Sequence, residues 1–281
     1  MAEPRAISQI FDSHLRELRV RRAEKRMEQN GVSFLIKRCL DDAVDRVLDV
    51  NRRFETVYLV ADFDLRAKFL SKLPQNKHPQ NLYFSNQINQ LSEPADLILC
   101  LLTLHNQDNP PDDIAHMSSC LKEDGLFIAA LFGGDTLTEL RQSLYKTDDE
   151  VLGGTTPRVF PMITHSQAAP LLTRAGLNLP VVDMDRFMVK YSQLEKLISD
   201  LRDIGATNIL LNRSSKNLTR KYYRRLNSHY QDMFSENKKL SASFEILWLT
   251  GWAPHHSQQK PLKPGSAKMR LADALNPKHK S

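Results

Sequence analysis

Short apolar runs alternate with helical patterns along the first half of the chain. Four such runs are VYLV from Val57, NLYF from Asn81, DLILCLL from Asp96 and LFIAALF from Leu126. Continuous apolar runs of this length are typical of strands in a parallel sheet that is buried on both faces. We therefore predict a parallel sheet for this half of the chain.

Helices are predicted before and between these strands. Two helices open the chain, and the second has apolar residues at spacings of three and four, namely Ile36, Leu40, Val44 and Val47. Further helices carry Leu65, Phe69 and Leu73, which precede Pro74, and Ile114, Met117 and Leu121. Strands that alternate with helices in this way predict a doubly wound α/β fold.

After Leu131 the chain changes to longer helices and strands. Three helices are predicted in GGDTLTELRQSL, in THSQAAPLLTRAG with Gly176 as its C-terminal cap, and after a capping box of Ser192 and Glu195. A fourth has apolar residues every four positions, which we interpret as a core stripe: Tyr222, Leu226, Tyr230 and Phe234. The runs LPVVDMDRFMVKY and SFEILWLTGW predict two strands, the second with one face formed by Phe244, Ile246, Trp248 and Trp252.

The 281 residues, 41% of them hydrophobic, are enough to bury one substantial core. We predict a helical N-terminal segment at 1–50, an α/β domain at 51–255 with a helical insert at about 192–238, and a polar tail at 256–281.

The net charge of +6 favours acidic ligands or partners. Basic residues between Arg213 and Arg225 are interleaved with tyrosines, but no nucleic-acid-binding module is recognisable, so nucleic acid is not the expected partner. Three widely spaced cysteines indicate neither a disulfide framework nor a zinc cluster. No apolar run is long enough to span a membrane or to form a signal peptide, and we expect the cytoplasm.

Ligands of doubly wound sheets bind beyond the carboxyl ends of the strands. The turn after the first predicted strand, VADFD, contains no glycine and has two carboxylates, Asp62 and Asp64. We interpret Asp64 as the N-cap of the helix that begins near Leu65. The next strand runs into Ser85 and Asn86, where an acid would be expected to hold ribose hydroxyls.

Two more loops offer candidate chemistry. His105 follows the third predicted strand and either acts near neutral pH as a base or ligand, or belongs to a turn-forming loop. Gly133 and Gly134 either admit a substrate backbone or close a tight turn, and Asp135 and Thr136 are candidate caps of the next helix. We predict no metal site, because His255 and His256 stand without a second cluster of ligands.

Several longer segments together resemble one protein family. They are IFDSHL, LTLHNQDNPPDDI, LKEDGLFIAALFGGDTLTELRQSL, RAGL with VVDMDRFMVKY, DLRDIGATN and FEILWLTGWAPHHSQQKPLKPGSAKMRLADAL. This set resembles the class I S-adenosylmethionine-dependent methyltransferases, in the branch of the malonyl-carrier-protein methyltransferases and the methyltransferase-like assembly factors of respiratory complex I. The resemblance implies a Rossmann-like sheet of seven strands with the last strand antiparallel, and helical insertions that cover a substrate cleft.

The resemblance also implies roles for particular residues. The cofactor, S-adenosylmethionine, is expected at Tyr58, Val60, Ala61, Asp62, Ser85 and Leu102. The expected catalytic residues are His105, Asp135 and Arg141. The expected substrate or partner surface is Gly133, Gly134, Thr136, Glu139 and Trp252.

The chain departs from the family pattern in the cofactor region. Tyr58 replaces an acid, Val60 and Asp62 replace glycines, and the chain between Phe84 and Asp96 is too short for a strand–helix unit that the family uses to hold adenine. Two functions stay open. One is a methyltransferase acting on a small molecule or a protein; the other is a catalytically inactive assembly or binding protein for a partner such as a complex I subunit.

Overall fold

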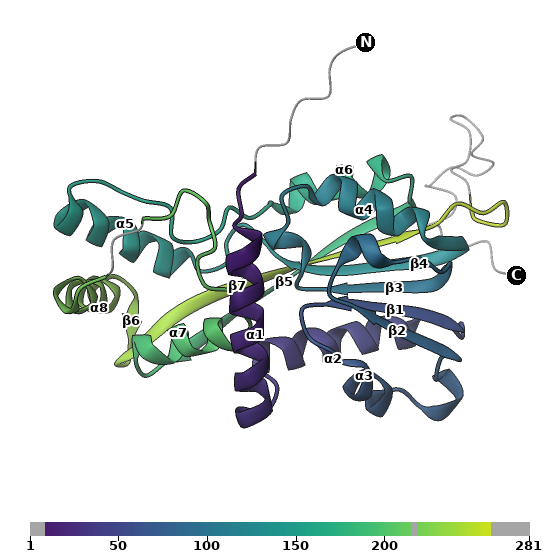
Figure 1. Ribbon diagram of the computed structural model, residues 1–281, viewed down its shortest axis with the longest axis horizontal. Coiled ribbons are helices and arrows are strands. Elements are labelled where there is room, and N and C mark those ends of the chain that lie inside the picture. Colours follow the sequence, from purple (N-terminus) through teal and green to yellow (C-terminus); the bar gives the residue numbers. More distant parts are fainter. Residues whose placement is uncertain (1–8, 215–217, 260–281) are drawn as a thin grey trace, which may run out of the picture.

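A computed structural model describes residues 9–214 and 218–259, so the expected polar tail beyond residue 259 lies outside the described residues. Its centre is a mixed sheet of strand order β2-β1-β3-β4-β7-β5, with β6 paired to β7 (Figure 1). The strands are β1 (Thr56–Ala61), β2 (Asn81–Ser85), β3 (Ala95–Leu101), β4 (Leu121–Phe132), β5 (Asn178–Tyr191), β6 (Ser235–Glu236) and β7 (Lys239–Trp252).

Eight α-helices are described among these residues. They are α1 (Ser13–Asn30), α2 (Phe34–Asp49), α3 (Arg66–Lys72), α4 (Pro110–Ser119), α5 (Thr138–Leu152), α6 (His165–Arg174), α7 (Leu194–Asp203) and α8 (Arg220–Phe234). None of the described helices is long and apolar enough to cross a membrane. The predicted α/β class is confirmed; the domain boundaries at 50 and 255 stay predictions.

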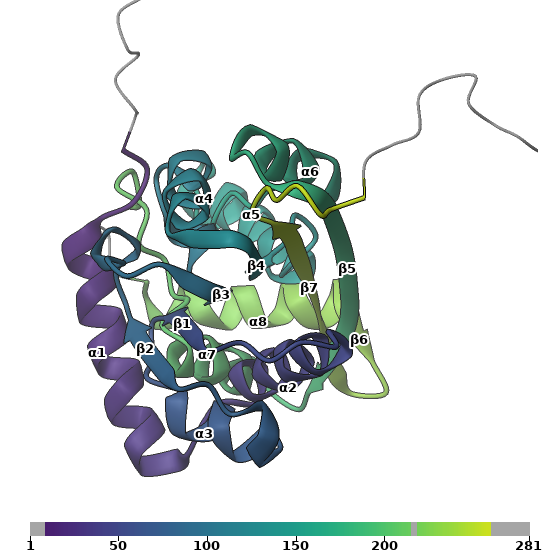
Figure 2. The same cartoon turned by 90° about the vertical axis from the view of Figure 1, so that its right-hand side faces the viewer.

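The sheet is parallel from β2 to β4, and β7 runs antiparallel between β4 and β5. The predicted parallel sheet and antiparallel last strand are thus confirmed. Side chains alternate along β1, so that Val57, Leu59 and Ala61 face one side while Tyr58 and Val60 face the other. Helices α2 and α3 cover the first side, and α4 and α6 cover the second (Figure 2).

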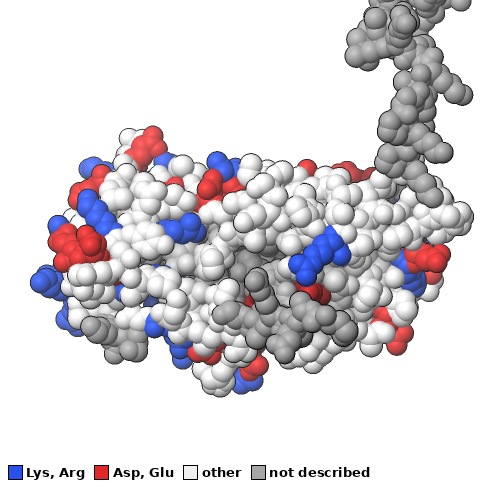
Figure 3. Space-filling view, turned by 90° about the horizontal axis from the view of Figure 1, so that it is seen from above, with Lys and Arg blue, Asp and Glu red and all other residues white. Residues whose placement is uncertain are grey.

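The two long strands β5 and β7 extend past the parallel strands, because β4 stops pairing with β7 at Phe132 and Ile246. Helices α5, α7 and α8 pack around this extension (Figure 1). Tyr222 and Tyr230 of α8 are buried there, which confirms the core interpretation of the aromatic stripe. Seen from above, charged side chains of both signs lie close together at the α5 end (Figure 3).

The strand–helix unit missing from the sequence is also missing from the described structure. Strand β2 lies at the edge of the sheet, and a single short 3-10 helix (Ile88–Gln90) connects it to β3. The sheet reaches seven strands through the two-residue β6.

Several local predictions were wrong. Leu121, predicted at the end of a helix, pairs with Ala95 and begins β4. The predicted capping box of Ser192 and Glu195 is not formed, because the N-cap of α7 is Gln193, without a side-chain hydrogen bond.

The caps of two other helices also differ from the predictions. The N-cap of α3 is Leu65; Asp64 instead accepts a hydrogen bond from the N–H of Arg66, 3.1 Å away. The N-cap of α5 is Leu137, in the left-handed region at φ 57°, so neither Asp135 nor Thr136 caps that helix. These local choices are set by tertiary packing, which short sequence patterns do not contain.

Candidate functional site

Three adjoining spaces lie at the carboxyl end of the parallel strands. The first, the polar groove, has a volume of about 240 Å³ and is lined by Arg16, Glu17, Val20, Arg21, Glu24, Asp62, Asn86 and Gln87. The second, the neck, holds about 20 Å³ and is lined by residues that include Ile36, Cys39, Ala61, Asp62, Phe63, Leu102, His105 and Asn106. Asp62 lines both spaces, so the neck adjoins the groove.

The third space, the apolar cavity, has a volume of about 220 Å³. It lies beneath α5, α7 and α8, and its lining includes Leu140, Leu144, Arg158, Phe160, Ile198, Leu201, Leu226 and Phe244. His105, Phe132 and Ala206 line both the neck and this cavity. A polar space, a narrow passage and an apolar space therefore follow one another along the edge of the sheet.

Asp62 is the central charge of the neck. It follows β1 directly, is 7% exposed, and forms an ion pair with Arg16 of α1. Burial raises the pKa of the Asp62 carboxyl, while Arg16 and a hydrogen bond from Asn106 oppose that rise. Helix α1 thus stands across the ends of the parallel strands (Figure 1) and closes the passage with a charged pair.

Three of the six expected cofactor residues, Ala61, Asp62 and Leu102, meet at the neck. Val60, which stands where the family has a glycine, does not line the neck, because its side chain packs on the α4 side of the sheet. Tyr58 faces that side too, where its hydroxyl accepts the N–H of Glu93 at 3.2 Å.

Ser85, the sixth, forms hydrogen bonds with the backbone of Gln87. It is the neighbouring Asn86 and Gln87 that line the polar groove. The sequence therefore located the end of β2 correctly but not the side chains that face the groove.

His105 lies where neck and apolar cavity meet, with its ring edge-on to Phe132 at 4.8 Å between centroids. Burial, with a smaller contribution from Arg16, lowers the pKa of His105 to about 3. The ring is thus neutral at pH 7. A role as base or ligand stays a prediction, and the 3-10 turn Leu104–Asn106 that contains His105 agrees with the alternative of a turn-forming loop. The Nδ1 of His105 is buried and has no hydrogen-bond partner among the described residues.

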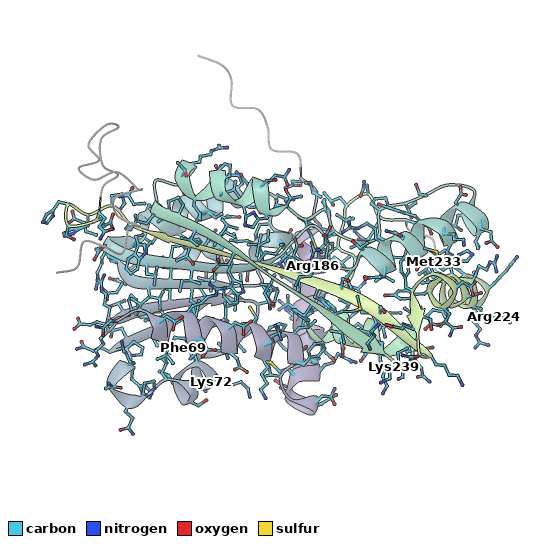
Figure 4. All side chains as sticks on the ribbon, turned by 180° about the vertical axis from the view of Figure 1, so that it is seen from behind. Phe69, Lys72, Arg186, Arg224, Met233 and Lys239 are labelled. Atoms are coloured by element: carbon cyan, nitrogen blue, oxygen red, sulfur yellow. The ribbon has the colours of Figure 1, made fainter. Side chains whose placement is uncertain are left out.

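Asp135 does not face the cavity. Its carboxylate pairs with Arg186, which projects from the middle of β5 (Figure 4). Arg186 also pairs at 2.7 Å with Glu245, whose neighbour Phe244 lines the cavity from the other face of β7. Arg141 donates to the carbonyl oxygens of Gly134 and Thr136 at 3.4 and 3.3 Å and so braces the turn before α5. The three expected catalytic residues are thus not brought together.

The expected substrate residues mostly hold the fold. Glu139 accepts hydrogen bonds from the N–H and hydroxyl of Ser243 at 2.8 and 2.5 Å. Gly133 is a close-approach position, since a Cβ there would lie 2.3 Å from Glu245 Oε1. Gly134 has more room: a Cβ there would lie 3.4 Å from Thr164.

Thr136 and Trp252 complete that set. Thr136 lines the apolar cavity, and its hydroxyl is bound to the backbone N–H and carbonyl of Glu245, both at 3.0 Å. Trp252 pairs with Leu126 at the start of the parallel part of β4, the end opposite the neck. Among the described residues, no three His, Cys, Asp or Glu are grouped to hold a metal ion.

Asp148 is a structural centre of the cavity wall that the sequence reasoning missed. Fully buried on α5, it accepts hydrogen bonds from Arg158 Nε at 2.9 Å, from the Tyr222 hydroxyl at 2.5 Å and from Thr156. Burial would raise the pKa of Asp148, but these hydrogen bonds lower it below its ordinary value. One signal was available: Asp148 follows Leu140 and Leu144 at four-residue steps on the buried face of the helix.

Comparisons with known proteins give several relatives. No protein-family model matches the chain. The "Arginine-hydroxylase NDUFAF5, mitochondrial" of Rattus norvegicus is 30% identical over 292 residues, which cover 96% of this chain and 84% of that protein. The protein of the same name from Dictyostelium discoideum is 37% identical over 181 residues, but the match spans only 41% of its length and 63% of this chain.

A second group of relatives carries a methyltransferase name. The "Malonyl-[acyl-carrier protein] O-methyltransferase" of Xylella fastidiosa is 32% identical over 160 residues, 57% of this chain and 52% of that protein. Among solved structures, one of a putative methyltransferase from Bacillus halodurans is similar at a TM-score of 0.48 and 14% identity, covering 76% of this chain and 99% of that one.

Proposed function

The chain belongs to the family of the NDUFAF5 proteins. Because it also resembles the class I S-adenosylmethionine-dependent methyltransferases, we propose that it binds S-adenosylmethionine in the polar groove and methylates an acceptor held in the apolar cavity. The observation that carries the proposal is a set of buried polar atoms at the passage between the two spaces. Arg16 Nε, His105 Nδ1 and Asn106 Oδ1 are all buried without a hydrogen-bond partner among the described residues. Such atoms are uncommon in folded proteins and favour a polar ligand at this place.

The residues of the polar groove fit the cofactor in their chemistry. Carboxylates suit its hydroxyl groups and its positive charge, amides suit its base, and an arginine suits its carboxylate. Glu17 and Glu24, Asn86 and Gln87, and Arg21 supply these groups. The neck has room for about one water molecule, so we infer that binding separates Arg16 from Asp62.

When bound, the cofactor supplies a methyl group carried on a positively charged sulfur. The chain's own part is to place an acceptor and to exclude water. The apolar cavity performs both tasks, because its aliphatic and aromatic lining favours the apolar body of an acceptor over water. Neutral His105 then orients a polar atom of the acceptor through Nδ1, and Asp62, once free of Arg16, stabilises positive charge at the passage.

Titration calorimetry with S-adenosylmethionine and S-adenosylhomocysteine tests this proposal. We expect the wild-type protein to bind, and we expect Arg16→Gln to bind at least about tenfold more tightly because the substitution frees Asp62. A tenfold change in affinity corresponds to about 1.4 kcal/mol of binding free energy. Arg224→Gln is the matched control, because Arg224 is an exposed arginine of α8 at the other end of the molecule (Figure 4). Absence of binding by wild type and Arg16→Gln at millimolar ligand, with both proteins folded by circular dichroism, would sink the proposal.

The closed Asp62–Arg16 pair favours a second function, that of a catalytically inactive assembly or binding protein for a partner such as a respiratory complex I subunit. In this case the apolar cavity holds an apolar segment of the partner. For such a protein the cofactor titrations would give no heat, yet Leu140→Trp, which fills the cavity, would abolish complementation of a deletion strain.

Nucleic acid remains the less favoured partner. Tyr222 is buried, so it is not available to a nucleic-acid surface.

The cellular location stays a prediction. The sequence favours the cytoplasm, whereas the relatives from rat and Dictyostelium carry "mitochondrial" in their names. Fractionation of cells that express the full chain would decide between the two.

A further inference from the structure

A second groove, lined by positive charges, runs between α1 and α7. This cationic groove has a volume of about 380 Å³ and is lined by Arg19, Arg22, Lys25, Arg26, Arg202, Gly205 and Thr207. All five charged side chains of the lining are cationic. The groove is separate from the polar groove, which faces the ends of β1 and β2 and contains carboxylates.

Most of this positive charge is not neutralised within the described part of the protein. Arg26 pairs with Asp203 and donates to the hydroxyl of Ser199 at 2.7 Å. Arg22, Lys25 and Arg202 form no ion pair with any described residue. An anion entering the groove would meet three cations that no described protein carboxylate already engages, which favours charge-assisted hydrogen bonds.

Arg19 gives an independent sign of an anion site. Its Nε is buried and has no hydrogen-bond partner among the described residues. Burial lowers the pKa of the Arg19 guanidinium, and the positive charges of Arg22, Arg202 and Arg213 lower it further. A bound anion would provide the missing acceptor and relieve the repulsion among these arginines.

The cationic groove adjoins the apolar cavity. Thr207 lines both spaces, and the consecutive residues Leu201 and Arg202 of α7 line the cavity and the groove respectively. Gly205, at φ 71°, follows the C-cap of α7, and a Cβ at this position would lie 3.7 Å from Val20 of α1. One ligand can therefore reach both spaces if it has a charged and an apolar end.

We propose that the cationic groove binds the anionic group of an amphipathic ligand, such as an alkyl or acyl phosphate, whose apolar chain occupies the apolar cavity. This names the chemical class of ligand for that cavity, and it rests on the proposed function only in taking the cavity as the acceptor site. A free amphipathic anion is the proposed source of the phosphate, as opposed to the headgroup of a membrane lipid.

Calorimetric titration of the full chain with dodecyl phosphate, below its critical micelle concentration and without S-adenosylmethionine, tests the proposal. We expect dodecyl phosphate to bind at least about tenfold more tightly than either inorganic phosphate or dodecanol. Inorganic phosphate lacks the apolar chain, and dodecanol lacks the anionic group. Arg202→Gln should lower the affinity for dodecyl phosphate about tenfold. Arg224→Gln makes the same change of charge at an exposed position of α8 and should leave that affinity unchanged.

Two results would overturn the proposal. One is equal weakening by Arg202→Gln and Arg224→Gln, which would reduce the effect to net charge. The other is binding to phosphatidic acid vesicles without binding to free dodecyl phosphate, which would assign the groove to a membrane surface. Because no cofactor is present, failure of S-adenosylmethionine to bind in the earlier titration leaves this test unaffected, and the two failures are distinguishable.

Discussion

The neck and the apolar cavity lie side by side at the same edge of one sheet, yet they are filled in opposite ways. The neck is packed like a core, with room for about 20 Å³ among apolar side chains and one buried ion pair. The cavity keeps about 220 Å³ beneath α5, α7 and α8. Both spaces lie near the strand ends, so this position does not determine their volume. The packing of the helices that cover each space determines it.

The covering helices differ in how they are held. Over the neck, α1 is attached to the strand ends by the Arg16–Asp62 pair, and further along it is attached to α7 by Arg26, which contacts Asp203 and Ser199. Over the cavity, α5 and α8 are joined through the buried Asp148 and Tyr222. Opening the neck requires Arg16 and Asp62 to separate, whereas opening the cavity wall requires the hydrogen bonds of Asp148 to break, so we expect the neck to open more readily than the cavity wall.

Asp148→Ala should have the largest effect, because it removes the acceptor of the cavity wall and leaves the guanidinium of Arg158, whose side chain is 12% exposed, without its carboxylate. We expect a loss of about 3–5 kcal/mol in the free energy of unfolding, measured with urea. Asp149→Ala is the control: Asp149 is the exposed neighbour of Asp148 on the same helix, so a change of no more than about 0.5 kcal/mol is expected. Losses of similar size in both variants would show that the cavity wall is not held by the buried network.

Packing substitutions on the two sides should have opposite signs. Ala61→Leu adds atoms to the filled neck and should cost about 1–3 kcal/mol of unfolding free energy. Leu140→Phe adds atoms to the open cavity and should stabilise the protein by about 0.5–2 kcal/mol. Urea unfolding of both variants measures these changes. If Ala61→Leu left the free energy of unfolding unchanged and Leu140→Phe lowered it, the neck would be the space with room and the cavity the filled one.

The sequence predicted what is local. The strands that contain Val57, Leu97 and Leu126 are continuous apolar runs, and the stripe from Tyr222 to Phe234 has a helical period, so the architecture could be predicted from short windows. The glycine-free turn after β1 drew attention to Asp62, which lines both the neck and the polar groove.

The site depends on contacts that short windows do not contain. Arg16 and Asp62 are 46 positions apart, and Asp148 and Tyr222 are 74 apart. Asp135 was expected in the site because the family resemblance implied it, but its carboxylate pairs with Arg186 of β5. Ion pairs between residues far apart in the sequence depend on the tertiary structure. These pairs determine which of the candidate side chains face the site.

The smallest predicted effect concerns the partial burial of Asp113 on α4. Burial raises the pKa of the Asp113 carboxyl to about 6; Asp112 and Asp108 raise it further, and His116 and Arg16 oppose the rise. The folded protein thus holds this proton to a higher pH than the unfolded chain, whose pKa is near 3.8, so stability falls as pH rises from about 4 to about 6.

Asp113→Asn cannot ionise at this position, and it keeps every other titrating group, His116 included. Its advantage in unfolding free energy over the wild type should grow between about pH 4 and pH 6 and then level off at about 1 kcal/mol, a value reduced for solvent screening. Urea unfolding of both proteins at several pH values measures this difference. A constant difference across the range would mean that Asp113 is as hydrated in the folded protein as in the unfolded chain.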